Sequence, residues 1–199
     1  MLLPVYPSTS RNRNPILSIL KKHLPYKGKV LETASATGEH IIFFAEKFPY
    51  LQWHPSDKSD KYFWAVKKRG DPLHNVQEPI CVDLTSISRV ELKPEFNAVL
   101  NINMIHISPW EACRGLFKLS STVIIKNGLI FLYGPFKEKN KKLASTNIDF
   151  DTQLQSQNPN WGIRLLDDVV TVAEEFGFIL LEKYQMPSNN LSIVFQKST

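Results

Sequence analysis

Val30-Leu31-Glu32-Thr33-Ala34-Ser35-Ala36-Thr37-Gly38-Glu39-His40 is the stretch that decides the fold of this chain. Val30 and Leu31 are typical of the end of a buried strand, and the apolar residues after Gly38 recur at helical spacing, at positions 41, 42, 44, 45 and 48. We therefore expect a strand, a tight turn of small residues and the start of a helix. A turn with so little side-chain bulk lets a ligand lie against the backbone at the positive end of the helix, as nucleotide-like cofactors do.

The spacing of the small residues argues against a dinucleotide. The dinucleotide fingerprint has small residues at its first, third and sixth positions, and counting from Ala34 the sixth position is Glu39. Here the small residues alternate instead, at Ala34, Ala36 and Gly38, directly after the acid Glu32. Taken alone, these residues also fit an ordinary strand-to-helix turn of any α/β protein.

Length and composition suit one domain over residues 1–199, because 43% hydrophobic content can fill a complete core. Cys81 and Cys113 both stand in apolar surroundings, which indicates reduced core residues and neither a disulfide nor a metal site. No apolar run reaches the length of a membrane span or of a signal-peptide core. We expect a soluble protein of the cytoplasm or nucleus without a membrane partner.

The net charge of +5 comes from short basic clusters, such as residues 67–69 and 137–142, that acids interrupt. Clusters of this kind are usually solvated faces, so nucleic acid is not the expected partner. RNA binding through the basic segment 137–142 stays a weaker hypothesis.

Strands and helices alternate along the rest of the chain, which predicts a doubly wound, mostly parallel α/β sheet. Strands are expected at 51–57, 79–84, within the apolar run 96–110, and at 129–136, 178–184 and 191–197; helices are expected at 15–24, 59–69, 86–90, 111–125 and 166–176. The last two strands are joined by the short turn 186–190 and must be antiparallel.

Two segments are expected to be irregular. Residues 1–14 are expected to form an arm, and the helix that begins at Pro15 is expected to have Asn14 as its N-terminal cap. In the arm, Arg11 or Arg13 could meet a ligand carboxylate; a frayed end is the alternative. Residues 137–160 form a lid or substrate loop, because a long polar stretch in a compact domain is usually functional or disordered. It carries Asn147, Asp149, Phe150 and Asp151, with Trp161 just beyond.

Polar residues stand where the predicted strands end. Asp57 follows Gly38 by 19 residues, about the distance at which an acid accepts hydrogen bonds from ribose hydroxyls, although it could instead cap the next helix. Asp83 ends the following strand and is the natural neighbour of an adenine amino group. Asn101 and Asn103 could orient an aminoacyl group or simply tie down the turn, since buried amides need partners.

His106 lies just past the central strand, where a base would stand to reach a substrate next to a cofactor. A hydrogen-bonded structural histidine is the alternative interpretation.

The acid followed by alternating small residues resembles motif I of the class I S-adenosylmethionine-dependent methyltransferases, acid-x-Gly-x-Gly-x-Gly. Longer strings resemble the methyltransferase-like protein 26 family over nearly the whole chain. They are Ser10-Arg11-Asn12 before Pro15-Ile16-Leu17, Ala34-Ser35 with Thr37-Gly38-Glu39-His40, Pro55-Ser56-Asp57, Asn101-Ile102-Asn103-Met104-Ile105-His106-Ile107-Ser108-Pro109-Trp110, Tyr133-Gly134-Pro135-Phe136, Phe150-Asp151, Asn158-Pro159 with Trp161-Gly162, and Met186-Pro187 with Asn189-Asn190.

The resemblance implies the strand order 3-2-1-4-5-7-6 and S-adenosylmethionine as cofactor. The candidate cofactor-binding residues are Arg11, Glu32, Ala34, Ser35, Gly38, Asp57, Asp83, Asn101 and Asn103, with Glu32 and the small turn on the methionine part. Tyr133, Asn189 and Asn190 would line the acceptor side, with His106 as base. The chain departs from the family at Ala36, where a glycine is usual, and alanine adopts a positive φ less readily than glycine.

The acceptor is unknown and is expected to be a small molecule or a protein. The Asn/Asp-Pro-Pro-aromatic string of amino-directed DNA methyltransferases is missing, since Asn103 is followed by Met104. No metal-ligand spacing occurs among the histidines and cysteines. Because Ala34 and Ala36 replace glycines, a catalytically inactive binding protein that acts through a partner is the alternative function.

Overall fold

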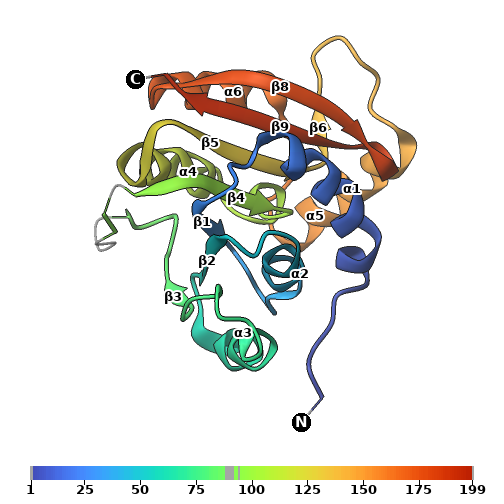
Figure 1. Ribbon diagram of the computed structural model, residues 1–199. Helices are drawn as coiled ribbons and strands as arrows, with labels where there is room; N and C mark the ends of the chain where they lie inside the picture. The colour runs from blue at the N-terminus through green and yellow to red at the C-terminus, as the bar shows by residue number, and fades with distance from the viewer. Residues whose placement is uncertain (1, 88–91, 94, 199) are drawn as a thin grey trace.

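A computed structural model describes residues 2–87, 92–93 and 95–198, and Figure 1 shows the arrangement of its helices and strands. In chain order the elements are α1 (Pro7–His23), β1 (Gly28–Thr33), α2 (Glu39–Lys47), β2 (Leu51–Asp57), the 3-10 turn η1 (Asp60–Tyr62), α3 (Phe63–Gly70), β3 (Ile80–Cys81), β4 (Phe96–Ile102), η3 (Ile105–Ile107), α4 (Trp110–Val123), β5 (Ile124–Gly134), β6 (Phe136–Lys137), α5 (Ser145–Gln157), β7 (Arg164–Leu165), α6 (Leu166–Glu175), β8 (Phe178–Met186), η4 (Pro187–Asn189) and β9 (Asn190–Lys197).

The described strands form a seven-stranded sheet in the order β3-β2-β1-β4-β5-β9-β8, and β6 pairs with β7 beside it. Strands β1 to β5 run parallel, whereas β9 is antiparallel to both β5 and β8. This is the order that the resemblance to the class I methyltransferase fold implied, so the predicted fold class is confirmed. In such a sheet the carboxyl ends of the parallel strands meet at one edge, where ligands bind.

Successive side chains of the central strands point to opposite faces, and each face has its own core. Leu31 and Val99 pack with residues of α4 and α6, while Val30 and Leu100 pack with residues of α1 and α2. Figure 1 shows these two pairs of helices on the two sides of the sheet. Strands buried on both faces explain the nearly continuous apolar runs of β1 and β4.

The N-terminal arm is not irregular as expected: α1 begins at Pro7, with Tyr6 and not Asn14 at its N-terminal boundary, and Pro15 lies inside the helix. The buried side of α1 consists of Thr9, Asn12, Ile16, Leu17, Ile19 and Leu20. Its first two turns therefore bury polar residues at helical spacing, and an apolar pattern could not reveal them. Pro15 costs the helix one backbone hydrogen bond, which the packing of the other turns offsets.

The expected loop 137–160 also contains a helix, α5, from Ser145 to Gln157. Its buried residues are Asn147, Asp151 and Leu154, so two of the three inward positions are polar. Asp151 joins α5 to β6 and to the residue before β7: its Oδ1 accepts a hydrogen bond from the Ile163 amide at 2.7 Å, and its Oδ2 pairs with Lys137 Nζ of β6 at 2.6 Å. The segment is irregular only over residues 138–144 and 158–160.

Several predicted helices and strands begin or end at other residues, because apolar side chains at these positions suit either a helix or a strand. The helix expected over 111–125 ends at Val123, because β5 already begins at Ile124. The helix expected over 59–69 divides into η1 and α3, and the strand expected over 79–84 is reduced to Ile80–Cys81. The short helix expected over 86–90 falls mostly outside the described residues.

Cys113 is buried as predicted, whereas Cys81 is exposed, since the edge strand β3 is covered on neither side at that position. Within the described ranges, no cluster of histidine, cysteine, aspartate or glutamate side chains is arranged to hold a metal ion. None of the helices described here has both the length and the apolar character that a membrane span needs.

Helix α4 approaches the loop after β3 so closely that a Cβ on Gly115 would overlap the carbonyl oxygen of Leu84. Replacing Gly115 with alanine should therefore lower the free energy of unfolding by about 2 kcal/mol, because a packed backbone cannot give way cheaply. Lys118→Ala, on the exposed side of the same helix, should change it by less than about 0.5 kcal/mol. Urea denaturation of the two variants compares these values; equal stabilities would contradict the close approach.

Candidate functional site

The turn between β1 and α2 alternates between two backbone conformations. Ala34, Ala36 and Gly38 have φ angles of 56°, 46° and 79°, in the left-handed region. The turn is tied to β2 and to itself, because the Ser35 amide donates to the Ser56 carbonyl at 2.9 Å and the Gly38 amide to the Ser35 carbonyl at 2.8 Å. An L-residue in this conformation costs roughly 1–2 kcal/mol. The two alanines thus adopt the conformation that glycines of the motif would, at the expense of strain.

Glu32, at the end of β1, carries a buried carboxyl group with an unused oxygen. The residue is 2% exposed, and its Oε2 has no hydrogen-bond partner among the described residues. Burial raises the pKa of Glu32 to about 7; a hydrogen bond with Ser35 opposes the shift, and the nearby charge of Asp57 adds to it. A carboxyl group in this state gains a great deal from a cationic hydrogen-bond donor.

Asp57, at the end of β2, binds the backbone of the turn. Its Oδ2 accepts a hydrogen bond from the Ala36 amide at 3.0 Å, and its Oδ1 accepts one from the Ser59 amide at 3.2 Å. The cap of η1 is Ser59, whose Oγ accepts from the Lys61 amide at 3.3 Å. The structure thus brings Asp57 together with Glu32 and the small-residue turn, and gives the capping role to a different residue.

Asp83 lies next to the end of β2, because the amide of Val82 donates to the Asp57 carbonyl at 2.8 Å. Its carboxylate makes a local turn: Oδ1 accepts from the amide of Thr85 at 2.8 Å and from its hydroxyl at 2.7 Å. These hydrogen bonds lower the pKa of Asp83. The backbone therefore places Asp83 at the expected edge, while its Oδ1 is already used within its own loop.

The two asparagines after the central strand have different surroundings. The Asn101 side chain is buried and donates to Thr33 Oγ1 at 2.8 Å, which ties β4 to β1. Asn103 has a φ of 56°, and its amide donates to the Tyr133 carbonyl at 2.8 Å, which extends the pairing of β4 with β5. Of the two alternatives for this pair, the contacts of Asn101 favour the structural one.

His106 lies on η3, past the end of β4, and is 4% exposed. Its Nδ1 has no hydrogen-bond partner among the described residues, and its ring packs edge-on against Phe150 with centroids 5.7 Å apart. A Cβ on Gly134 would lie 3.2 Å from this ring. Burial, with a smaller contribution from the charge of Arg164, lowers the pKa of His106 to about 4. The imidazole is therefore neutral at pH 7, and it is a weak base.

A chain of polar side chains crosses the site on the face covered by α1 and α2. His40 Nε2 is 2.7 Å from Asn12 Oδ1, and the Asn190 amide donates to the Tyr133 hydroxyl at 3.2 Å. Burial raises the pKa of Tyr133, while hydrogen bonds from the amides of Asn190 and Asn12 oppose that shift. Burial also lowers the pKa of His40 to about 4, so this histidine is neutral at pH 7.

Asn12 and His40 are site residues that sequence reasoning did not single out. The available signal was a polar residue at position 12 on the same helical face as Ile16 and Leu20, which an amphipathic helix normally fills with apolar side chains. Arg11, which was singled out, lies on the exposed side of α1. No hydrogen bond or ion pair within the described part of the chain joins it to Glu32 or Asp57.

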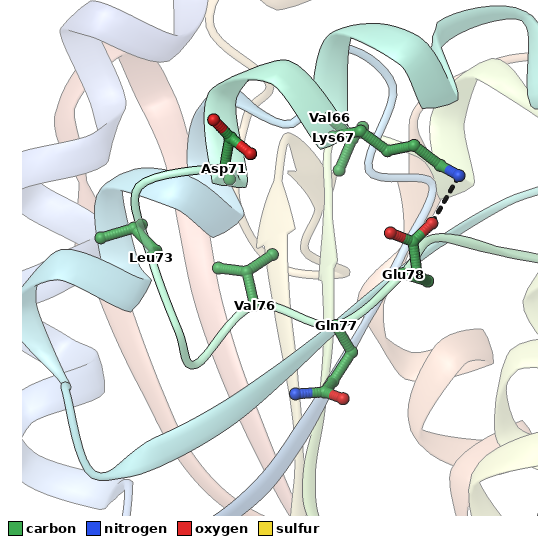
Figure 2. A pocket seen from close by; sticks show the side chains of 8 residues that line it. Val66, Lys67, Asp71, Leu73, Val76, Gln77 and Glu78 are labelled. Carbon is green, nitrogen blue, oxygen red and sulfur yellow. Dashed lines mark ion pairs between the residues drawn. The ribbon is translucent and has the colours of Figure 1, made fainter.

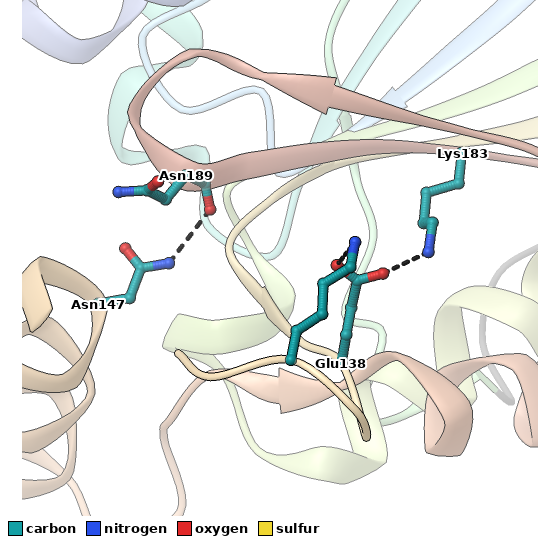
Figure 3. A network of polar contacts seen from close by, with 5 residues as sticks. Glu138, Asn147, Lys183 and Asn189 are labelled. Atoms are coloured by element: carbon teal, nitrogen blue, oxygen red, sulfur yellow. Dashed lines mark hydrogen bonds and ion pairs between the residues drawn. The ribbon is translucent and has the colours of Figure 1, made fainter. Parts of the chain in front are cut away.

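The turn before β9 is held by α5. Asn147 donates to the carbonyl of Asn189 at 3.1 Å, and Figure 3 shows this contact together with the ion pairs of Glu138 with Lys141 and Lys183. A hollow of about 130 Å³ lies between these residues. Asn189 itself has a φ of 57°, so its backbone is part of the tight turn. The structure therefore places Asn190 against Tyr133, whereas the contacts of Asn189 are with Asn147 and Thr146 of α5.

A second hollow, of about 220 Å³, lies between α3 and residues 71–78 (Figure 2). It is bounded by Val66, Leu73 and Val76, with the Lys67–Glu78 ion pair at its rim. Neither Glu32 nor Asp57 lines either hollow. The polar cluster at the sheet edge is therefore defined by its hydrogen bonds and buried charges.

Residues 3–197 match the sequence model of a family described as "Protein of unknown function (DUF938)". The chain belongs to the DUF938 family. That family description assigns no activity, and the fold of this DUF938 member is shared with solved structures of other families.

Three of these structures illustrate the likeness. An O-methyltransferase family protein from Burkholderia thailandensis has a TM-score of 0.79 at 13% identity, covering 96% of this chain and 58% of that one. Human N-acetylserotonin methyltransferase, in complex with SAM, has a TM-score of 0.80 at 11% identity, covering 96% and 53%. A Bacillus halodurans protein described as a candidate methyltransferase has a TM-score of 0.72 at 14% identity, covering 92% and 99%. The DUF938 chain spans a little over half the length of the first two, and these likenesses show its class I methyltransferase fold.

In this DUF938 protein, Glu32 should make stability depend on pH. The pKa of Glu32 in the folded chain lies above the ordinary value, so its contribution to the free energy of unfolding is complete below about pH 4.5 and is lost as the pH rises through 7. Relative to Glu32→Gln, the native chain should lose about 2 kcal/mol of unfolding free energy between pH 5 and pH 8. Denaturation at both pH values measures this, and Glu46→Gln, on the exposed side of α2, should keep the native pH dependence. A Glu32→Gln variant that follows the native pH profile would contradict the assignment.

Ala36→Gly should raise the free energy of unfolding by about 0.5 kcal/mol, because relief of the left-handed strain exceeds the added entropy of the unfolded chain. Ala144, with a φ of −60°, provides the matched control, and Ala144→Gly should lower the same quantity by about 0.5 kcal/mol. Thermal and urea denaturation measure whether the free energy of unfolding rises in Ala36→Gly and falls in Ala144→Gly. Destabilisation of equal size in the two variants would mean that Ala36 is not strained.

Proposed function

We propose that this protein is an S-adenosylmethionine-dependent methyltransferase whose cofactor lies on the turn between β1 and α2. One observation carries the proposal: three alternating left-handed positions at Ala34, Ala36 and Gly38 directly follow Glu32, a buried acid with an oxygen that has no hydrogen-bond partner in the part of the chain that the structure describes. The first feature opens the backbone to a ligand at the start of a helix, and the second supplies a buried acceptor for a cationic group.

The residues present fit the cofactor at both of its ends. The Glu32 carboxylate would accept hydrogen bonds from the ammonium of the methionine part, and the backbone of Ala34, Ser35 and Gly38 would lie against that part. Asp57 would hold the ribose hydroxyls, and Asp83 would lie at the adenine edge. Ligand binding should draw the Glu32 carboxyl into its charged form, because a positive charge nearby lowers the pKa that burial has raised.

S-adenosylmethionine supplies a methyl group that is already activated, so the protein has mainly to align a nucleophile and exclude water. Tyr133, Asn189 and Asn190 would line the acceptor side, since Asn190 donates to the Tyr133 hydroxyl at the end of β5 and Asn189 precedes it in the same turn. His106 would face the acceptor with a neutral ring whose Nδ1 has no partner among the described residues and can accept a hydrogen bond. Its low pKa suits orientation of the nucleophile better than removal of a tightly held proton.

The fold neighbours support this proposal, because one of them, human N-acetylserotonin methyltransferase, is in complex with SAM, and another is described as an O-methyltransferase family protein. The narrower resemblance to the methyltransferase-like protein 26 family belongs to the same proposal. Its strings at residues 34–40, 55–57 and 133–136 lie at the carboxyl edge of the sheet. A small molecule or a protein is the proposed class of acceptor, within a soluble, intracellular setting.

The alternative is a methyltransferase-like binding protein without turnover. The observation that favours it is the strain at Ala34 and Ala36, which glycines would not have. The same turn conformation is nevertheless present, so the alternative predicts cofactor binding without methyl transfer. Incubation of the chain with S-adenosylmethionine that carries tritium in its methyl group, together with a heat-inactivated cell extract, separates the two, since label then reaches an acceptor only if this chain transfers it.

Titration calorimetry with S-adenosylhomocysteine tests the binding site. We expect a dissociation constant in the micromolar range for the native chain and a loss of about tenfold or more in Asp57→Asn, because a charged partner of the ribose hydroxyls is removed. Asp71→Asn changes an exposed aspartate that follows α3 and should bind like the native chain. Affinity of the native chain should rise between pH 6 and pH 8 as Glu32 ionises.

Two results would count against the proposal. The absence of heat at high micromolar ligand would remove the cofactor from this site. Equal affinities for Asp57→Asn and Asp71→Asn would show that the ligand binds elsewhere.

A further inference from the structure

The residues before α1 lie against the small-residue turn. The Tyr6 amide donates to Glu39 Oε2 at 2.7 Å, and the Thr37 hydroxyl donates to the same oxygen at 3.0 Å. Glu39 belongs to the first turn of α2, so its carboxylate joins the segment before α1 to the turn that precedes α2. In Figure 1 the N-terminal segment leaves α1 and runs past α2 toward the side of α3.

A second anchor comes from α3. The guanidinium of Arg69 donates through Nη2 to the carbonyl of Pro4 at 2.5 Å and through Nε to the carbonyl of Thr37 at 3.1 Å. Arg69 therefore bridges the same two segments as Glu39. Charge-assisted hydrogen bonds of this kind are stronger than neutral ones, and here they hold the segment before α1 against the turn.

The Tyr6 side chain extends this contact across the edge of the sheet. A hydrogen bond with the side chain of Tyr62, in η1, is the main reason why the pKa of Tyr6 is raised, and the negative charges of Glu39 and Asp57 add to the shift. Tyr6 is 46% exposed, so a large part of the side chain is not covered by protein.

We propose that residues 4–6 form a strap over the cofactor site and that Tyr6 contacts the adenosyl part of the bound cofactor. The inference rests on the proposed function, because Asp57 and the turn at Ala36 are assigned to that ligand. The strap is joined to the turn by Glu39 and Arg69 and to η1 by the tyrosine pair, and the Asp57 carboxylate is held between the same turn, at Ala36, and Ser59, which caps η1. An aromatic side chain there offers its face to a nucleobase or ribose.

The strap also regulates exchange of the cofactor. A ligand that lies between the turn and Tyr6 leaves only after the contacts of Pro4 and Tyr6 have opened. A segment with little buried surface that is held by a few hydrogen bonds opens readily compared with the core. Loss of the strap should therefore accelerate dissociation of the ligand more than it changes association, as is usual for contacts that close over a bound molecule.

Stopped-flow displacement of S-adenosylhomocysteine measures the dissociation rate directly. Tyr6→Ala should increase this rate by about tenfold or more, and Glu39→Gln, which keeps an acceptor but removes its charge, by about threefold. Tyr26→Ala is the matched control, because Tyr26 is another exposed tyrosine in contact with a tyrosine, Tyr50, with ring centroids 4.6 Å apart. Tyr26 precedes β1, at the amino end of the parallel strands, so the ligand should dissociate from this variant at the native rate.

Hydrogen exchange gives a readout that a purely structural role would not move. Exchange of the Tyr6 amide should slow by about tenfold or more when S-adenosylhomocysteine is bound, since the ligand holds the strap closed. Tyr6→Phe keeps the ring and loses the bond to Tyr62, so its dissociation rate should fall between those of the native chain and Tyr6→Ala. If Tyr6→Ala fails to fold, Tyr6→Phe still provides a measured dissociation rate that tests the role of the side chain.

The outcomes separate the inference from the function on which it rests. Native dissociation rates in Tyr6→Ala and Glu39→Gln, with binding intact, would overturn the strap and leave the methyltransferase proposal standing. A native chain that does not bind S-adenosylhomocysteine would overturn both.

Discussion

The reversal of the backbone between β1 and α2 is the constraint on which the rest of the site depends. Within a few residues the chain must leave a buried strand and enter a helix whose first amides face the sheet edge, and three left-handed positions achieve this. Polar contacts then attach the neighbouring elements to the turn and to the start of α2. Asp57 of β2 accepts a hydrogen bond from the amide of Ala36, and Arg69 of α3 donates one to the carbonyl of Thr37. Asn12 of α1 contacts His40 in the first turn of α2.

The same region departs from the rules that stabilise a fold. Two alanines are held in the left-handed region, and among the described residues one oxygen of the buried Glu32 carboxyl and Nδ1 of the buried His106 have no hydrogen-bond partner. Such features lower stability, and they persist because the packed sheet and its two helical layers determine the backbone around them. Their occurrence together at the carboxyl edge of the sheet, where ligands bind in this class of fold, is the physical reason for assigning that edge to a ligand.

Sequence patterns located the elements that bury apolar side chains, with errors at their ends, and missed those that bury polar ones. The bounds of β2 and the reversed hairpin at the end of the chain followed from apolar runs and a short turn, as did the parallel core around β1 and β4. The first turns of α1 and the whole of α5 were missed, because their inward positions include Thr9 and Asn12, and Asn147 and Asp151. A polar residue on a buried helical face has no periodic signal, yet it is the kind of residue that a site needs.

By itself, the sequence determined the class of fold and the position of the turn, because alternating strands and helices leave few topologies and alternating small residues leave few turn conformations. The tertiary structure alone decided which polar groups meet there. It brought Asp57 to the amide of Ala36, left an oxygen of Glu32 unpartnered by any described residue, and used Asn101 to tie two strands together. Those outcomes depend on distances between strands and helices far apart in the chain, which no local pattern of residues contains.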